Sequence, residues 1–120
     1  MKLRIFALGL LMAASTLASA HAKLTASSPV EKSHVAAPDK LALTFTDSVV
    51  LTALTLQHGK APAKKLDLPS QADYGFNIPL PKLVPGDYAV AWRVVSDDTH
   101  VSSGTIHFTV VADKAKTSAQ

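Results

Sequence analysis

The chain has 120 residues, with 12 Lys or Arg, 9 Asp or Glu, and no Cys. This length provides one modest hydrophobic core and argues against a multidomain protein. The lack of cysteine excludes disulfide bonds and thiolate metal sites, so apolar packing must hold the fold.

Residues 1–20 have the pattern of a secretory signal peptide. Lys2 and Arg4 give a basic start, IFALGLLMAA is an apolar run, and the small residues ASA fit a signal peptidase. The apolar run is too short to span about 30 Å of hydrocarbon at ~1.5 Å per residue. We therefore expect an exported protein without stable membrane insertion, cleaved after Ala20.

Removal of this leader changes the composition. Only Lys2 and Arg4 are lost from the charged residues, which leaves 10 basic and 9 acidic side chains and a net charge of +1. That charge gives no support to a nucleic-acid partner. Both methionines, Met1 and Met12, are also lost, so the rest of the chain has no sulfur ligand. We expect residues 21–120 to form one domain with a frayed tail from about 112.

The same cleavage makes His21 the first residue of the exported protein. Its α-amine and its imidazole Nδ1 can then close a six-membered chelate ring on one metal ion. The reference pKa values are about 7.7–8.0 for the amine and ~6.5 for the imidazole, so deprotonation at neutral pH costs little. His21 is therefore a candidate metal ligand with two nitrogen donors.

Four segments alternate apolar and polar residues with the period of two that is typical of β-strands. They are KLALTFTD (40–47), LTALTLQHG (51–59), DYAVAWRVVS (87–96) and GTIHFTVV (104–111). Prolines lie between them or near their ends, and no convincing helical stripe follows the leader. We predict an all-β antiparallel sandwich. In three of the segments the pattern predicts which side chains point inward: Leu41, Leu43 and Phe45; Tyr88, Val90, Trp92 and Val94; and Ile106, Phe108 and Val110. In the segment 51–59 it predicts only that one face carries Leu51, Ala53, Thr55 and Gln57 and the other face Thr52, Leu54, Leu56 and His58.

The stretch LVPGDYAVAW sharpens this interpretation. A Pro-Gly turn is followed by Tyr88 at a strand start, as in the tyrosine corner of Greek-key sandwiches. In that role Tyr88 and Trp92 belong to the core and are not platforms for a substrate.

The stretch SDDTHVSSG follows the third of these strands and carries two further candidate ligands, Asp98 and His100. Residues two apart in an extended backbone project to the same side, so a carboxylate and an imidazole can face one point. With His21 they make a set of nitrogen and oxygen donors that suits Cu(II). The spacing is a weak motif, and Asp98 capping its own turn is the alternative.

The remaining candidates are weaker. Asp97 competes with Asp98 but does not share the side of His100 in extended geometry. We expect three other histidines to be solvated and not to bind metal: His34 in the loop EKSHVAAPD, His58 before Gly59, and His107 on the outward side of a strand.

The landmarks HAKLTASSPVEKS, LALTFTDSV and LVPGDYAVAWRVVSDDTHVSSGTIHFTV occur in this order over nearly the whole length after the leader. In this respect the chain resembles the CopC family of periplasmic copper-binding, copper-resistance proteins. The resemblance implies a seven-stranded antiparallel Greek-key β-sandwich, Ig-like or cupredoxin-like. It also implies a Cu(II) site formed by His21 with its amine, Asp98 and His100. Some family members hold Cu(I) in a methionine-rich loop, which this chain lacks, so it resembles a Cu(II)-only type.

The function that this resemblance implies is a periplasmic Cu(II) carrier or buffer in copper homeostasis and resistance, not an enzyme. Its expected partners are the copper ion and an inner-membrane copper transporter of CopD type, and the chain is expected to be a monomer. One alternative is a copper-dependent oxidative enzyme of the histidine-brace type, such as the lytic polysaccharide monooxygenases. The other is an adhesion or interaction sandwich without metal.

Overall fold

The computed structural model describes residues 22–112, and these form seven β-strands and no helix. The predicted leader, His21 and the tail beyond residue 112 lie outside the described residues. The strands are β1 (Leu24–Ser28), β2 (Ser33–Val35), β3 (Lys40–His58), β4 (Lys64–Lys65), β5 (Asp73–Pro79), β6 (Gly86–Ser96) and β7 (Val101–Val110). Residues 22–112 include no helix with the length and hydropathy that crossing a membrane requires.

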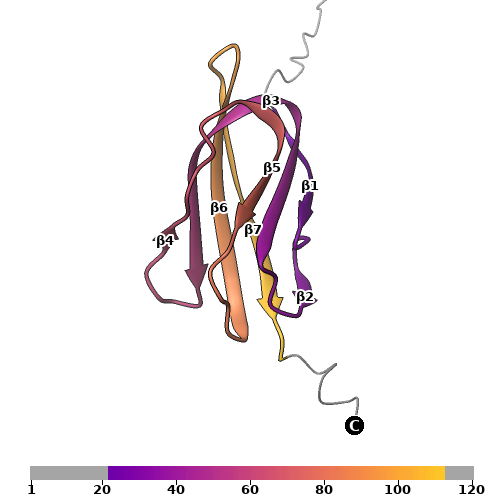
Figure 1. The fold of residues 1–120 in the computed structure, drawn as a ribbon, viewed down its shortest axis with the longest axis vertical. Helices are drawn as coiled ribbons and strands as arrows, with labels where there is room; N and C mark the ends of the chain where they lie inside the picture. The colour runs from indigo at the N-terminus through magenta and orange to yellow at the C-terminus, as the bar shows by residue number, and fades with distance from the viewer. Residues whose placement is uncertain (1–21, 113–120) are drawn as a thin grey trace, which may run out of the picture.

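The long strand β3 belongs to both layers of a sandwich. Its first part, residues 40–45, pairs with β1 and β5, and its second part, residues 49–58, pairs with β6 and β4. Figure 1 shows β3 bending over one end of the molecule between these two parts. The second layer continues from β6 to β7 and then to β2. The bend of β3 therefore lies at the end of the sandwich where β6 also ends.

The core is made of the inward faces that the period of two predicts. The buried apolar residues are Ala22, Leu41, Leu43, Phe45, Val49, Leu51, Leu54, Leu56, Phe76, Ile78, Leu83, Tyr88, Val90, Trp92, Val94, Ile106, Phe108 and Val110. No charged or polar residue is buried within residues 22–112. This separation of apolar from polar groups is what stabilises a sandwich that has no disulfide bond.

The predicted all-β class and the seven strands are confirmed, and so is the tyrosine corner. The Tyr88 hydroxyl donates to the carbonyl of Val84 at 2.7 Å and accepts from the Val84 N–H at 3.1 Å. Tyr88 and Trp92 are 5% and 8% exposed, so both belong to the core as expected.

Three local predictions differ from the structure. The alternation expected over residues 51–57 is broken by a register shift between Leu51 and Ala53, which buries Leu51 together with Leu54 and Leu56. His34 was expected in a loop but lies in β2, because this short segment pairs with β7 along the sheet edge. That pairing is parallel, within a sandwich that was predicted to be antiparallel.

Candidate metal centre

The connection between β6 and β7 is a tight hairpin turn. The Ser96 N–H donates to the His100 carbonyl at 3.0 Å, and the Thr99 N–H donates to the Ser96 carbonyl at 2.8 Å. Thr99 has a φ of 66°, in the left-handed region that a β-branched residue rarely adopts. This turn reverses the chain within a few residues and exposes its side chains at one end of the sandwich.

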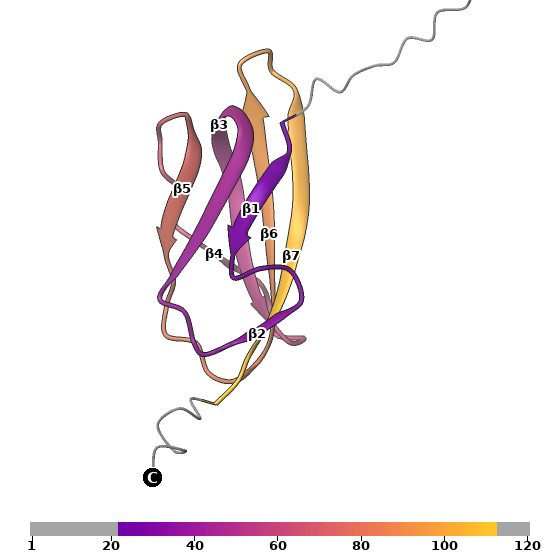
Figure 2. The same cartoon turned by 90° about the vertical axis from the view of Figure 1, so that its right-hand side faces the viewer.

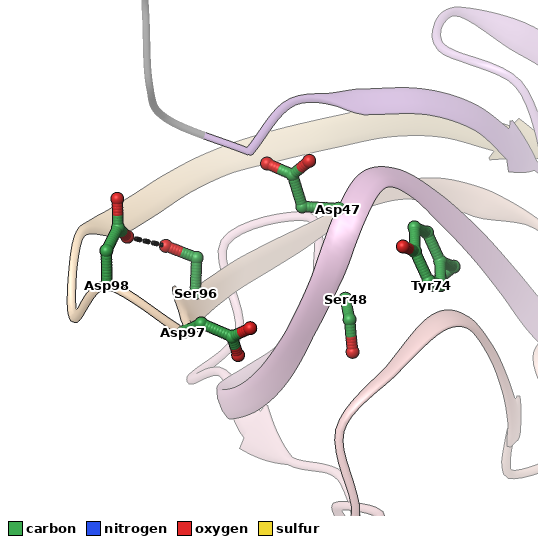
Figure 3. Close-up of a pocket in the computed structure, with 6 residues that line it drawn as sticks. All are labelled: Asp47, Ser48, Tyr74, Ser96, Asp97 and Asp98. Atoms are coloured by element: carbon green, nitrogen blue, oxygen red, sulfur yellow. Dashed lines mark hydrogen bonds between the residues drawn. The ribbon is translucent and has the colours of Figure 1, made fainter.

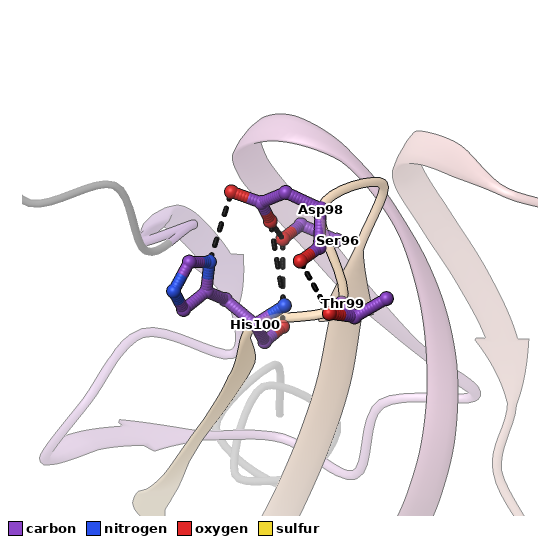
Figure 4. A network of polar contacts seen from close by, with 4 residues as sticks. All are labelled: Ser96, Asp98, Thr99 and His100. Carbon is purple, nitrogen blue, oxygen red and sulfur yellow. Dashed lines mark hydrogen bonds and ion pairs between the residues drawn. The ribbon is translucent and has the colours of Figure 1, made fainter.

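Asp98 and His100 meet across this turn. Asp98 Oδ2 lies 2.9 Å from His100 Nδ1, and the two side chains are 52% and 47% exposed respectively. Figure 4 shows the imidazole facing the carboxylate. The sequence predicted that the two side chains would share a side of an extended segment. They do come together, but the turn and the left-handed Thr99 bring them there.

Three contacts orient the Asp98 carboxylate. Oδ1 accepts the Ser96 hydroxyl at 2.5 Å and the His100 backbone N–H at 3.3 Å, while Oδ2 faces the imidazole. The Ser96 hydroxyl, followed by the His100 contacts, lowers the pKa of Asp98 from 3.8 to about 2. Asp98 therefore caps its own turn through Oδ1 and meets the imidazole through Oδ2, so the two interpretations of the Asp-Thr-His motif concern different oxygens. The carboxylate is anionic at neutral pH.

The start of the described chain lies at the same end of the sandwich as this turn (Figure 2). The Lys23 N–H donates to Thr46 Oγ1 at 3.0 Å, and the Thr46 N–H donates to the Lys23 carbonyl at 2.9 Å. Three residues further along β3, Val49 pairs with Ser96. Ala22 is 4% exposed and packs in the core. These contacts fix the direction from which the chain enters the fold.

A cavity of 290 Å³ adjoins the turn. It is lined by Asp47, Ser48, Tyr74, Ser96, Asp97 and Asp98, so three of its six residues are carboxylates. In Figure 3 the Asp97 carboxylate points toward Ser48, whereas that of Asp98 lies beside Ser96. Asp97 therefore faces the cavity, and Asp98 is the aspartate that contacts His100.

Asp98 and His100 offer one oxygen and one nitrogen donor, which are ligands that a borderline divalent ion accepts. Within residues 22–112, no group of three or more His, Cys, Asp or Glu side chains is arranged to hold a metal ion.

The other three histidines lie in different surroundings. His58, at the end of β3, stacks on Tyr88 with ring centroids 4.5 Å apart and an interplanar angle of 11°. His34 is exposed in β2. His107 Nδ1 lies 3.3 Å from Glu31 Oε2, and the His107 N–H donates to Glu31 Oε1 at 2.7 Å. His107 faces outward as predicted, but it has a carboxylate partner.

The sequence analysis missed Ser96, although the Ser-x-Asp spacing was visible. A serine two residues before an aspartate is common in loops, and only the turn geometry shows that its hydroxyl reaches the carboxylate.

The comparisons with known proteins agree with the fold and with the turn. Residues 24–111 match the family model described as the CopC domain. The chain belongs to the CopC family. This match covers all seven strands of the CopC domain described above, including the turn that carries Asp98 and His100.

Curated relatives and solved structures give the same result. The chain is 36% identical over 117 residues to "Copper resistance protein C" of Pseudomonas syringae pv. tomato, covering 88% of this chain and 91% of that protein. It is 34% identical over 114 residues to the Escherichia coli protein of that name, covering 85% of this chain and 90% of that protein. The crystal structure of CopC from Methylosinus trichosporium OB3b superposes with a TM-score of 0.68 at 27% identity, over 78% of this chain and 96% of that one. PcoC from Escherichia coli, described as a methionine-rich copper resistance protein, gives a TM-score of 0.61 at 34% identity, over 77% and 100%.

Proposed function

We propose that this CopC-family chain is a periplasmic Cu(II)-binding protein, a carrier or buffer in copper homeostasis and resistance. The single observation that carries the proposal is the contact between the carboxylate of Asp98 and the imidazole of His100, at 2.9 Å on an exposed turn. Relatives of similar length are named copper resistance proteins, which supports copper as the cargo.

The remaining donors come from His21 in this proposal. His21 precedes Ala22 in the sequence, and the described chain starts at the end of the sandwich that carries the turn. Cleavage after Ala20 frees the α-amine of His21, and the amine and Nδ1 then chelate the ion. Together with Asp98 and His100 this gives three nitrogens and one oxygen.

The donor chemistry favours the oxidised ion. Nitrogen and carboxylate donors in a tetragonal arrangement suit Cu(II), whereas Cu(I) prefers thioether or thiolate ligands. Met1 and Met12, the two methionines of the chain, both lie in the proposed leader, and cysteine is absent. In this respect the chain differs from PcoC, whose description calls it methionine-rich. We therefore assign the Cu(II)-only type to this protein.

The proposed partners follow from this role. Copper is the cargo, and an inner-membrane copper transporter of CopD type receives or supplies it, with the protein acting as a monomer. We assign the protein to the periplasm because the proposed leader directs export and the histidine chelate forms only after that leader is removed.

A binding role suits the site better than oxidative catalysis. A copper enzyme of the histidine-brace type keeps a coordination position open for oxygen, whereas in this proposal Asp98 occupies one. The large aromatic side chains Trp92 and Tyr88 are committed to the core and offer no surface to a polysaccharide.

The test uses protein exported with its own leader. Mass spectrometry is expected to give His21 as the first residue and one copper ion per chain after Cu(II) addition, with an EPR spectrum of nitrogen-rich tetragonal Cu(II). The copper form is expected to produce no oxidised polysaccharide when a reductant and peroxide are added. A folded protein that retains no Cu(II) would support the metal-free alternative, and oxidised product would support the enzyme.

A further inference from the structure

The hydroxyl of Ser96 has a role that the closure of the hairpin does not require. The backbone of Ser96 already makes both turn hydrogen bonds, to the His100 carbonyl and from the Thr99 N–H. The two backbone hydrogen bonds that close the turn do not involve the Ser96 side chain. Its single hydroxyl hydrogen goes to Asp98 Oδ1 at 2.5 Å, since the other acceptor within reach, the His100 carbonyl, is 3.4 Å away.

With this hydrogen bond in place, the two Asp98 oxygens have different partners. Oδ1 accepts from the Ser96 hydroxyl and from the His100 backbone N–H, while Oδ2 faces the His100 ring at 2.9 Å. A carboxylate accepts about four hydrogen bonds in all. Because Oδ1 already has two donors, Oδ2 is the oxygen with acceptor capacity left beside the imidazole. The anchored oxygen thus sets the direction of the other.

Among residues 22–112, the Ser96 hydroxyl makes the shortest of the three contacts that orient the carboxylate, and the other two come from His100. The Asp98 side chain is 52% exposed, so packing against apolar neighbours does not select its rotamer. An exposed carboxylate without a strong partner samples several rotamers in water, and ordering it on binding costs free energy. The Ser96 hydrogen bond, together with the two His100 contacts, lowers this cost before any ion arrives.

We propose that Ser96 is a positioning residue of the copper site, whose hydroxyl anchors Asp98 Oδ1 and thereby keeps Oδ2 beside the imidazole of His100. The inference rests on the proposed function, since it assigns a role to Ser96 only where Asp98 is a ligand. Partners that orient metal ligands change metal affinity by roughly 10–100-fold when they are removed. Ser96 does not touch the ion itself.

The test compares Ser96→Ala, which removes the hydroxyl, with Ser96→Thr, which keeps it. Ser103→Ala is the matched control, because Ser103 is an exposed serine of the same hairpin. Cu(II) affinity is measured by competition with a chelator of known affinity, and the Asp98 side-chain rotamer of the metal-free protein is measured by NMR couplings. We expect Ser96→Ala to weaken binding by about 10-fold or more and to leave the Asp98 rotamer averaged. Ser96→Thr is expected to restore both readouts, and Ser103→Ala to change neither.

A purely structural role for Ser96 would instead lower the unfolding temperature of the metal-free protein and leave the Asp98 rotamer fixed. Wild-type affinity and a fixed Asp98 rotamer in Ser96→Ala would overturn the inference. Asp98→Ala, measured in parallel, separates this failure from that of the proposed function. If Asp98→Ala weakens binding while Ser96→Ala does not, only the role of Ser96 is wrong. If neither variant weakens binding, Asp98 is not a ligand and both proposals fail together.

Discussion

Two histidine–carboxylate contacts occur within residues 22–112, and they differ in what they join. Asp98 and His100 are two residues apart in one turn, with Nδ1 2.9 Å from Oδ2. Glu31 and His107 are 76 residues apart, with Nδ1 3.3 Å from Oε2. His100 directly precedes β7 and His107 lies within it, so about 23 Å of extended chain separates them at ~3.3 Å per residue. Both pairs are exposed, and in both an imidazole Nδ1 contacts a carboxylate oxygen, so this contact alone does not distinguish them.

The backbone distinguishes the two pairs. Glu31 Oε1 accepts the His107 N–H at 2.7 Å, and the neighbouring Lys32 N–H donates to the His107 carbonyl. These bonds tie the segment before β2 to the edge of β7. Among the described residues, the partners of Asp98 belong instead to its own turn, at the end of the sandwich where the described chain starts. The Glu31–His107 pair is therefore a clamp between distant segments, whereas the Asp98–His100 pair is a candidate pair of metal ligands within one turn.

The largest effect that separates the two pairs is on copper affinity. His100→Ala removes a proposed nitrogen ligand, and Asp98→Ala removes the proposed oxygen ligand. We expect each to weaken Cu(II) binding by more than about 10-fold, whereas His107→Ala binds as the wild type does. Isothermal titration of the three variants checks this. If His107→Ala lost as much Cu(II) affinity as His100→Ala, the assignment of the copper site to the Asp98–His100 pair would be contradicted.

The next effect concerns the stability of the metal-free protein, for which the Glu31–His107 pair is expected to matter while leaving copper affinity unchanged. Glu31→Gln removes the charge that receives the His107 N–H, so the metal-free protein is expected to unfold at a temperature lower by less than about 5 °C. Its copper affinity should be unchanged. Thermal unfolding followed by Trp92 fluorescence measures the shift, with Asp39→Asn as a control at an exposed aspartate. An unchanged unfolding temperature would mean that the clamp contributes nothing.

The third effect is a pH dependence. The pKa of Asp98 is about 2 in the folded protein, below 3.8, because the Ser96 hydroxyl and then His100 favour the charged form. A depressed pKa contributes stability above the unfolded value, and this contribution is lost as the pH falls through the folded value. The metal-free wild type should therefore lose stability more steeply than Asp98→Asn between pH 4 and pH 2. Denaturant unfolding at these pH values measures it, and parallel curves for the two proteins would contradict the assignment.

The smallest effect is at Thr99, which adopts a left-handed φ of 66° between the two donors. A left-handed backbone costs most residues roughly 1–2 kcal/mol, and Asn tolerates it better than Thr. Thr99→Asn is expected to raise the free energy of unfolding by up to about 1 kcal/mol, with copper affinity within a factor of about 3 because the donors stay in place. A lower free energy of unfolding in Thr99→Asn would show that the Thr side chain itself stabilises the turn.

Much of the fold could be predicted from the sequence, because burial on one side of a strand imposes a period of two. The inward faces of residues 41–45, 88–94 and 106–110 are as predicted. The prediction failed at residues 51–57, where one extra residue in the strand exchanges the faces. It also failed at His34, because a three-residue edge strand has no pattern of its own and forms only when β7 is beside it.

The candidate site was predicted only in part. The pairing of Asp98 with His100 follows from their spacing, but the sequence analysis assumed an extended backbone, and a turn with a left-handed residue brings them together. The contact between the Ser96 hydroxyl and Asp98 could not be predicted from the sequence, since a contact of 2.5 Å depends on the φ and ψ angles of the whole turn. The role of His21 remains a prediction, because that residue lies outside the described range.

The most direct test of the account concerns the α-amine of His21. Two folded forms are compared, one beginning at His21 and one with a single glycine before it, which converts the amine into an amide. We predict that the extended form loses more than the roughly 10–100-fold in Cu(II) affinity that an outer-shell partner contributes. Its metal-free unfolding temperature should stay within about 2 °C of the processed form. Equal Cu(II) affinity in the two forms would contradict the histidine chelate on which the proposed function depends.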